Sequence, residues 1–181
     1  MSQSVAEALA AFRQRNGIPH DEVERATWVC RLGPLSIRLP NFSWRRRAIL
    51  AHDLHHLVTA YPCTLRGECQ MAAWEFGAGQ MPHWGARLFC LPLVLLGVVW
   101  SPRSTWRAFL SGRQSTSLHG AKLDQRALAA PFDSLHAELA APRRAGVLPP
   151  RLLFARLVVE AVLIVSAPLA MIAGLWLALG A

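Results

Sequence analysis

The sequence contains few charged residues and few cysteines for its length. Only 17% of its 181 residues are charged, whereas 53% are hydrophobic. Disordered chains combine low hydrophobicity with high charge, so this composition excludes extensive disorder. Four cysteines at irregular spacing are too few to hold a disulfide scaffold. The length suits one folded domain of ordinary size.

Several functional signatures are also missing. The first fifteen residues lack the apolar core of a secretory signal, so we expect the folded part to begin in the cytoplasm. The glycines do not cluster into a phosphate-binding loop, and no nucleophilic triad is recognisable. The net charge of +8 favours an anionic partner. Because no basic element is interleaved with aromatic residues, we expect an anionic membrane surface rather than nucleic acid.

Cap and turn residues divide most of the chain into helical segments. Ser43 and Thr64 are good N-caps for two helices joined by a short turn. A small hairpin is expected at 28–38 around Gly33 and Pro34. The predicted fold is therefore mostly α, a helical bundle with a small N-terminal hairpin. The expected helices lie at 1–15, 22–27, 44–60, 65–79, 82–100, 105–111 and 132–139.

The C-terminal segment differs from the rest because residues 161–181 carry no charge. A helix of this length spans about 30 Å, the thickness of a bilayer core. Arginines precede the segment and no basic residue follows it. The sequence thus predicts a C-terminal transmembrane helix in the bacterial inner membrane, with the folded domain on the cytosolic side. The predicted organisation is a metal-binding helical domain at 1–141, a basic linker at 142–156 and the anchor at 157–181.

Two features of the apolar segments leave alternatives open. Small residues recur every four positions from Ser166 to Ala178, which is compatible with a close helix partner and a homo-oligomer. An alanine-rich segment produces the same stripe by chance. The apolar stretch 88–100 is too short to span a bilayer, so it is either a core helix or one wall of a lipid-facing groove.

A histidine-rich stretch carries the clearest chemical signal. His52 and His56 are four residues apart, about 40° on a helical wheel, so both imidazoles can reach one ion. Asp53 lies about 60° from His56 on the wheel. It is therefore either a third ligand or a residue that orients an imidazole. A single pair of this kind is often only surface chemistry, and His55 is compatible with a solvated neighbour.

The start of the following helix supplies a carboxylate. If the two helices are antiparallel, Glu68 meets His52 and His56 across the turn and completes a His₂-carboxylate set with open positions. Zinc or iron(II) accepts such ligands. Glu75 lies on the same face, roughly 10 Å further along, so we expect a catalytic role toward substrate or a supporting role rather than ligation.

The spacing resembles that of a known family. The pattern consists of His52-Asp53-x-x-His56, eleven further residues and then Glu68, with Pro62 and Gly67 before the glutamate. It is similar to the pattern of the ubiquinone (coenzyme Q) biosynthesis proteins known as the fourth coenzyme Q protein family. The similarity is clear over about 46–82. It implies a helical fold, a metal held by His52, Asp53, His56 and Glu68, and a groove for an isoprenoid tail. This chain departs from the pattern at His55, at Ala73 and in its apolar C-terminal segment.

The resemblance implies metal-dependent oxidative decarboxylation (hydroxylation) at carbon 1 of a prenylated aromatic acid. Implied partners are the prenylated quinone precursor, membrane lipid and other quinone-biosynthesis proteins. One alternative is a non-catalytic, lipid-binding scaffold of the biosynthetic complex with a structural metal. A second is a membrane-associated, metal-dependent hydroxylase of another lipid. Membrane di-iron hydroxylases need about eight histidines in several boxes, but outside this cluster only His20, His83, His119 and His136 remain, all isolated. A zinc peptidase is disfavoured because Asp53 stands where its glutamate base would be.

Overall fold

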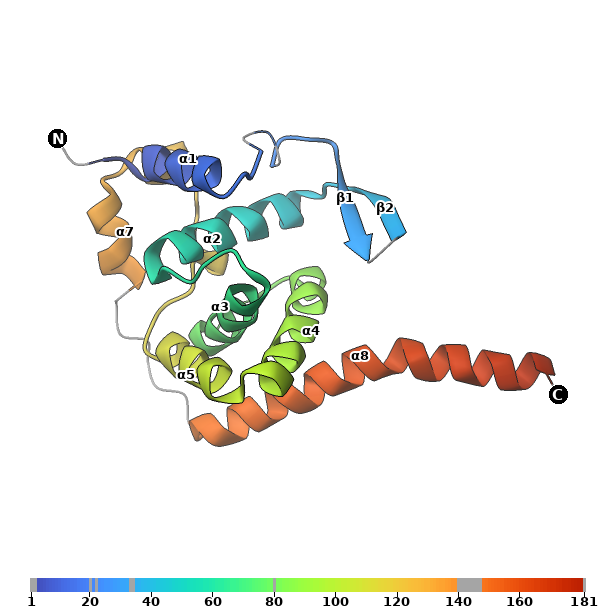
Figure 1. Ribbon diagram of the computed structural model, residues 1–181. Helices are drawn as coiled ribbons and strands as arrows, with labels where there is room; N and C mark the ends of the chain where they lie inside the picture. The colour runs from blue at the N-terminus through green and yellow to red at the C-terminus, as the bar shows by residue number, and fades with distance from the viewer. Residues whose placement is uncertain are drawn as a thin grey trace.

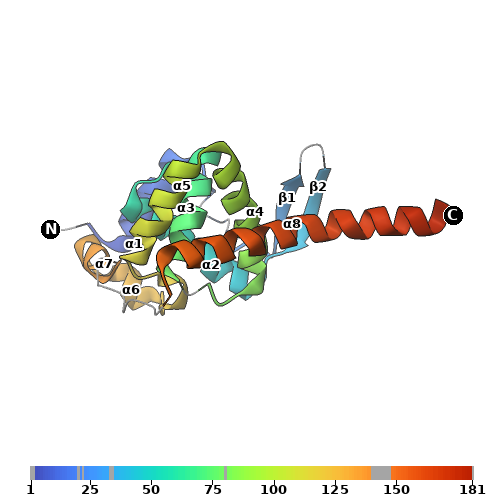
Figure 2. The same ribbon diagram turned by 90° about the horizontal axis from the view of Figure 1, so that it is seen from below.

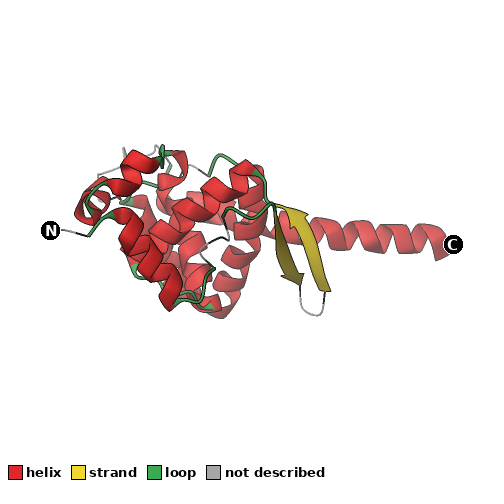
Figure 3. Cartoon of the chain, turned by 90° about the horizontal axis from the view of Figure 1, so that it is seen from above, coloured by secondary structure: helices red, strands yellow, loops and turns green. Residues whose placement is uncertain are grey.

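The computed structural model describes residues 3–19, 21, 23–32, 35–79, 81–139 and 148–180. Within these ranges the protein is built almost entirely from helices, with one small hairpin (Figure 3). This is the helical bundle with a hairpin that the sequence predicts. In chain order the elements are α1 (Val5–Arg15), β1 (Thr27–Leu32), β2 (Leu35–Pro40), α2 (Ser43–Thr59), α3 (Leu65–Ala78), α4 (Trp84–Trp100), α5 (Pro102–Arg113), η1 (Leu118–Gly120), α6 (Gln125–Ala129), α7 (Phe132–Leu139) and α8 (Pro150–Gly180).

The hairpin pairs β1 with β2 in antiparallel register, from Thr27 opposite Pro40 to Leu32 opposite Leu35. The predicted turn residues 33–34 lie outside the described residues. The short helix predicted at 22–27 is wrong, because turns occupy the described residues before β1, which begins at Thr27. The N-cap role predicted for Ser43 is wrong, because Ser43 is the first residue of α2 and no side chain among the described residues caps this N-terminus.

Helix α3 lies at the centre of the body, packed against α4 and α5 (Figure 1). Two glycines allow α3 and α5 to approach each other backbone to backbone. A Cβ at Gly77 would lie 2.2 Å from the Phe109 carbonyl oxygen, and one at Gly112 would lie 2.0 Å from the Trp74 carbonyl oxygen. Atoms this close would clash, so both positions require glycine. The fixed α3 helix then presents its other residues to α2 and α4.

Helix α8 runs beneath the body along α4 and then extends past it (Figures 1 and 2). Its N-terminal half is a packing surface, because Leu157 and Ala161 are buried and Glu160 pairs with Arg87 of α4. No helix in the described part of the chain combines the length and apolar character that crossing a bilayer requires. The transmembrane helix predicted at 157–181 is therefore wrong, and the inner-membrane location that depended on it is withdrawn.

The predicted linker is only partly within the described structure. Residues 140–147, which include the predicted boundary between 141 and 142, lie outside the described residues. Helix α8 begins at Pro150, inside the range predicted as linker, and continues without interruption past residue 157. The charged residues of 150–160 and the uncharged residues that follow therefore belong to one helix.

Candidate metal centre

The turn between α2 and α3 brings the two helices together at the predicted ligands. Ala60 adopts a left-handed conformation with φ 58°, and its N–H donates to the His56 carbonyl oxygen. Thr64 caps α3 as predicted, since its hydroxyl accepts from the Gly67 N–H at 3.2 Å. Gly67 itself is required by a close approach, because a Cβ there would lie 1.8 Å from the Pro62 carbonyl oxygen. The loop thus folds tightly onto the first turn of α3, next to Glu68.

Two imidazoles from α2 and one carboxylate from α3 converge at this point. His52 Nε2 lies 3.1 Å from His56 Nε2 and 3.1 Å from Glu68 Oε2. His56 Nε2 lies 3.3 Å from Glu68 Oε1. Donor atoms bound to one ion at about 2.1 Å, with angles of 90–110°, are about 2.9–3.4 Å apart. The three residues therefore form a group with the separations of a ligand set, and it could hold a metal ion.

Hydrogen bonds on the far side of each ring leave both Nε2 atoms directed at this point. His56 Nδ1 lies 2.8 Å from the Tyr61 carbonyl oxygen, and His52 Nδ1 lies 3.1 Å from Glu75 Oε1. Because a carbonyl or carboxylate oxygen only accepts, both Nδ1 atoms carry their protons and donate. Metal-binding histidines are typically oriented by such an outer hydrogen bond.

In the metal-free arrangement a proton provides the positive charge between these groups. Burial opposes the charged ring of His52, but the charge of Glu75 and hydrogen bonds to both carboxylates raise its pKa well above 6.5. Burial likewise opposes ionisation of Glu68, but hydrogen bonds with His52 and His56 lower its pKa to about 2. A divalent cation would replace the Nε2 proton of His52, as metal binding to histidine generally does.

Glu75 is the centre of a second hydrogen-bonded group. Its Oε1 atom lies 3.1 Å from His52 Nδ1, 2.8 Å from His55 Nδ1 and 3.0 Å from His119 Nε2. The carboxylate is fully buried. Burial would raise its pKa, but the positive charge of His52 and the three imidazole hydrogen bonds lower the pKa well below 4.5.

Geometry alone makes His55, Glu75 and His119 a second group that could hold an ion. The hydrogen bonds of His55 argue against ligation. Its Nε2 accepts from the Leu118 N–H at 2.9 Å, and burial lowers its pKa to about 4, so the ring is neutral at pH 7. The single proton is therefore on Nδ1, where it donates to Glu75. Neither nitrogen of His55 offers a lone pair to a metal.

Asp53, the remaining residue of the predicted ligand set, faces a different partner. Its Oδ2 atom lies 2.8 Å from Nε and 2.7 Å from a terminal nitrogen of Arg13 in α1. Both side chains are largely buried. Burial raises the pKa of Asp53, while the Arg13 charge works in the opposite direction. Among the described residues, Asp53 belongs to neither of the two groups of converging ligand atoms.

The structure brings His52, His56, Glu68 and Glu75 together, and adds partners that the sequence analysis did not assign. His119 is isolated in the sequence, yet it contacts Glu75, 44 residues earlier in the chain. The sequence pattern is compatible with His55 as a solvated neighbour, but the side chain is fully buried. For His119 no local sequence pattern provides a signal. For His55 the signal was its place four residues after Ala51, on a face of α2 that is buried in the core.

An apolar cavity of about 210 Å³ opens beside the ligand group. His52, Glu68 and Glu75 form one wall, and most of the remaining lining is apolar. Arg45 stacks on the Trp28 ring at 3.8 Å and brings positive charge to this lining. The other lining residues are Trp44, Ala48, Ile49, Ala86, Phe89, Cys90, Leu93 and His119.

Comparisons with protein-family models, curated proteins and solved structures found no match to this chain. The case for a metal centre therefore depends on the geometry of His52, His56 and Glu68. The case for a quinone substrate depends on the sequence pattern at 46–82 and on the cavity.

Proposed function

We propose that this protein is a metal-dependent enzyme that acts on an apolar aromatic acid. The observation that carries the proposal is the position of the ligand group: His52 Nε2 and the Glu68 carboxylate converge in the wall of an apolar cavity. Ligand pockets for small molecules are typically apolar with a few polar groups at the reacting end. This arrangement would place an aromatic ring directly beside the ion.

The metal in this proposal is iron(II) or zinc. Non-haem iron(II) oxygenases typically hold their metal with two histidines and one carboxylate and leave the remaining coordination positions open. Zinc accepts the same ligands. When bound, iron(II) would activate dioxygen, of which one oxygen atom enters the ring as hydroxyl while the carboxylate leaves as carbon dioxide. A two-electron reductant such as ascorbate would reduce the other oxygen atom to water. We therefore favour iron for an oxidative reaction.

The protein's own residues orient the ligands and shape the substrate site. Glu75 holds the Nδ1 proton of His52, which keeps the Nε2 lone pair directed at the ion. Trp28 and Phe89, whose rings meet edge to face at 5.5 Å, contribute apolar surface to the cavity lining. The guanidinium of Arg45 would attract the negative charge of a carboxylate substrate.

In its most specific form, the proposal is oxidative decarboxylation at carbon 1 of a prenylated aromatic acid in quinone biosynthesis. The spacing His52-x₃-His56-x₁₁-Glu68 supports this substrate class. The apolar lining of the cavity supports it independently, because a prenylated ring is apolar over most of its surface. Partner proteins of the same pathway are part of this proposal.

The test is anaerobic reconstitution with iron(II), followed by oxygen, ascorbate as the two-electron reductant and a short-chain prenylated benzoic acid. We expect release of carbon dioxide and a product in which hydroxyl replaces the carboxylate. His52→Ala should abolish the reaction, whereas His136→Ala, at an exposed histidine outside the ligand group, should retain it. Tight metal binding without turnover, unaffected by exchange of iron for zinc, would instead favour the scaffold.

A further inference from the structure

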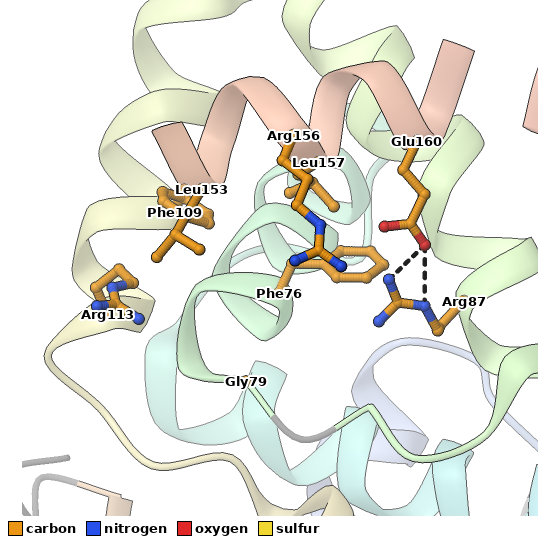
Figure 4. Close-up of a pocket in the computed structure, with 9 residues that line it drawn as sticks. All are labelled: Phe76, Gly79, Arg87, Phe109, Arg113, Leu153, Arg156, Leu157 and Glu160. Carbon is orange, nitrogen blue, oxygen red and sulfur yellow. Dashed lines mark hydrogen bonds and ion pairs between the residues drawn. The ribbon is translucent and has the colours of Figure 1, made fainter. Parts of the chain in front are cut away.

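A second pocket, of about 220 Å³, lies where α8 packs onto the body and shares no lining residue with the cavity at the metal centre. Figure 4 shows its two sides, with Arg156 and Glu160 descending from α8 toward Phe76 of α3 and Arg87 of α4. Its lining consists of Phe76, Gly79, Arg87, Phe109, Arg113, Leu153, Arg156, Leu157 and Glu160.

Positive charge exceeds negative charge in this pocket. Three arginines and one glutamate line it, so its formal charge is +2. Glu160 is already engaged, because its Oε1 accepts from two nitrogens of Arg87. Arg87 also lies over the Phe76 ring, 5.2 Å from its centroid, which fixes that guanidinium further.

Because Glu160 pairs with Arg87, Arg156 has no carboxylate partner within the described part of the chain. Arg156 is one turn before Glu160 on α8, a spacing at which an arginine and a glutamate commonly pair. Glu160 instead pairs across the helix interface with Arg87. Among the described residues, neither Arg156 nor Arg113 forms an ion pair with an acidic side chain. Figure 4 shows the Arg156 guanidinium directed into the pocket.

We propose that this pocket binds a phosphate group at Arg156 of α8, with Arg113 of α5 adding positive charge to the same lining, over a floor of aromatic and leucine side chains. A dianion neutralises the formal charge of +2. Guanidinium groups suit it because their planar N–H donors match phosphate oxygens two at a time. The apolar floor strengthens the attraction, since charges interact more strongly where water is partly excluded.

The test is equilibrium dialysis with labelled inorganic phosphate and, in a second arm, with phenyl phosphate at matched ionic strength. The full chain carries His52→Ala, so that an ion at the metal centre contributes no phosphate binding. We expect one phosphate bound per chain. Arg156→Gln should weaken binding at least tenfold and Arg113→Gln by a smaller factor, whereas the matched control Arg151→Gln, at an exposed arginine of the same helix, should not change it. Arg156 is exposed, so its variant should fold normally.

Thermal unfolding provides a second measurement. A ligand that binds only the folded state should raise Tm by roughly 3–6 °C for each tenfold excess over Kd in a protein of this size. Tighter binding of phenyl phosphate identifies the ligand as a phosphate ester, and equal binding identifies free phosphate. The proposal is overturned if no phosphate binds, or if Arg151→Gln weakens binding as much as Arg156→Gln. Either result leaves the proposed function intact, because the pocket and the metal centre are tested separately.

Discussion

Two groups of two histidines and one glutamate lie side by side in this protein, yet their chemistry differs. In the first group, His52 and His56 each donate an Nδ1 proton away from the centre, so their Nε2 atoms converge with Glu68. In the second, His55 has both ring nitrogens engaged, one by the Leu118 N–H and one by Glu75. The separations within each group satisfy the same distance criterion.

The comparison shows that distance between ligand atoms does not define a metal site. The hydrogen bonds on the outer side of each imidazole decide which nitrogen keeps a lone pair. Glu75 links the two groups because it accepts from His52 on one side and from His55 and His119 on the other. The second group is thus best described as the support that orients a ligand of the first.

The largest effect is expected from removal of a ligand in the first group. His56→Ala should lower the affinity for Co²⁺ or Zn²⁺ by more than about 100-fold, beyond what the loss of an outer hydrogen-bond partner costs. The measurement is competition with a chromophoric chelator, combined with metal analysis of the purified protein. His136→Ala is the control. Stoichiometric, tight metal in His56→Ala would show that the first group is not the ligand set.

A smaller loss is expected when the link between the groups is weakened. Glu75→Gln keeps the size of the side chain but removes the charge that holds the His52 Nδ1 proton. We expect the affinity for metal to fall about 10–100-fold, the range typical of outer partners, with the stoichiometry unchanged. The same chelator competition measures it. A Glu75→Gln protein with wild-type affinity would break the proposed connection between the two groups.

Removal of His55 should affect folding more than metal binding. His55→Ala leaves the buried Leu118 N–H without its acceptor, which costs about 1–3 kcal/mol in the free energy of unfolding. Urea denaturation in the presence of a chelator measures this loss. Metal affinity should fall less than in His56→Ala. If it falls equally, His55 is a ligand and the distinction between the groups is wrong.

The sequence predicted those parts of the site that depend on local spacing. His52 and His56 share a helix face because they are four residues apart, and the Thr64 cap fixes where α3 begins and therefore where Glu68 stands. The contacts of His119 with Glu75 and of Asp53 with Arg13 join residues 44 and 40 positions apart. No local pattern encodes such pairs, because they arise only when separate helices pack.

The error at the C-terminus has a different origin. The first turns of the segment predicted as the anchor are compatible both with lipid around them and with packing on a protein surface. Ala161 is buried in the body together with Leu157, and α4 supplies the Arg87 partner of Glu160. Composition cannot distinguish these two environments. The decisive information is again a contact between segments distant in the sequence.

The smallest effects, and the most direct contrast between the two groups, are expected in the pH dependence of the metal-free protein. The pKa of His55 is lowered by burial to about 4, so between pH 6.5 and 4 the unfolded chain binds a proton that the folded chain does not, and stability falls as pH falls. The pKa of His52 is raised above 6.5 despite its burial, mainly by Glu75 and Glu68, so its contribution is full below pH 6.5 and is lost as pH rises. Each slope is limited to about 1.4 kcal/mol per pH unit for one proton.

Urea titrations from pH 5 to 9 should therefore show a maximum in the free energy of unfolding. His55→Gln should flatten the acid side of this maximum, and His52→Gln should flatten the alkaline side. Variants that flatten the opposite sides would reverse the assignment of the neutral and the charged ring.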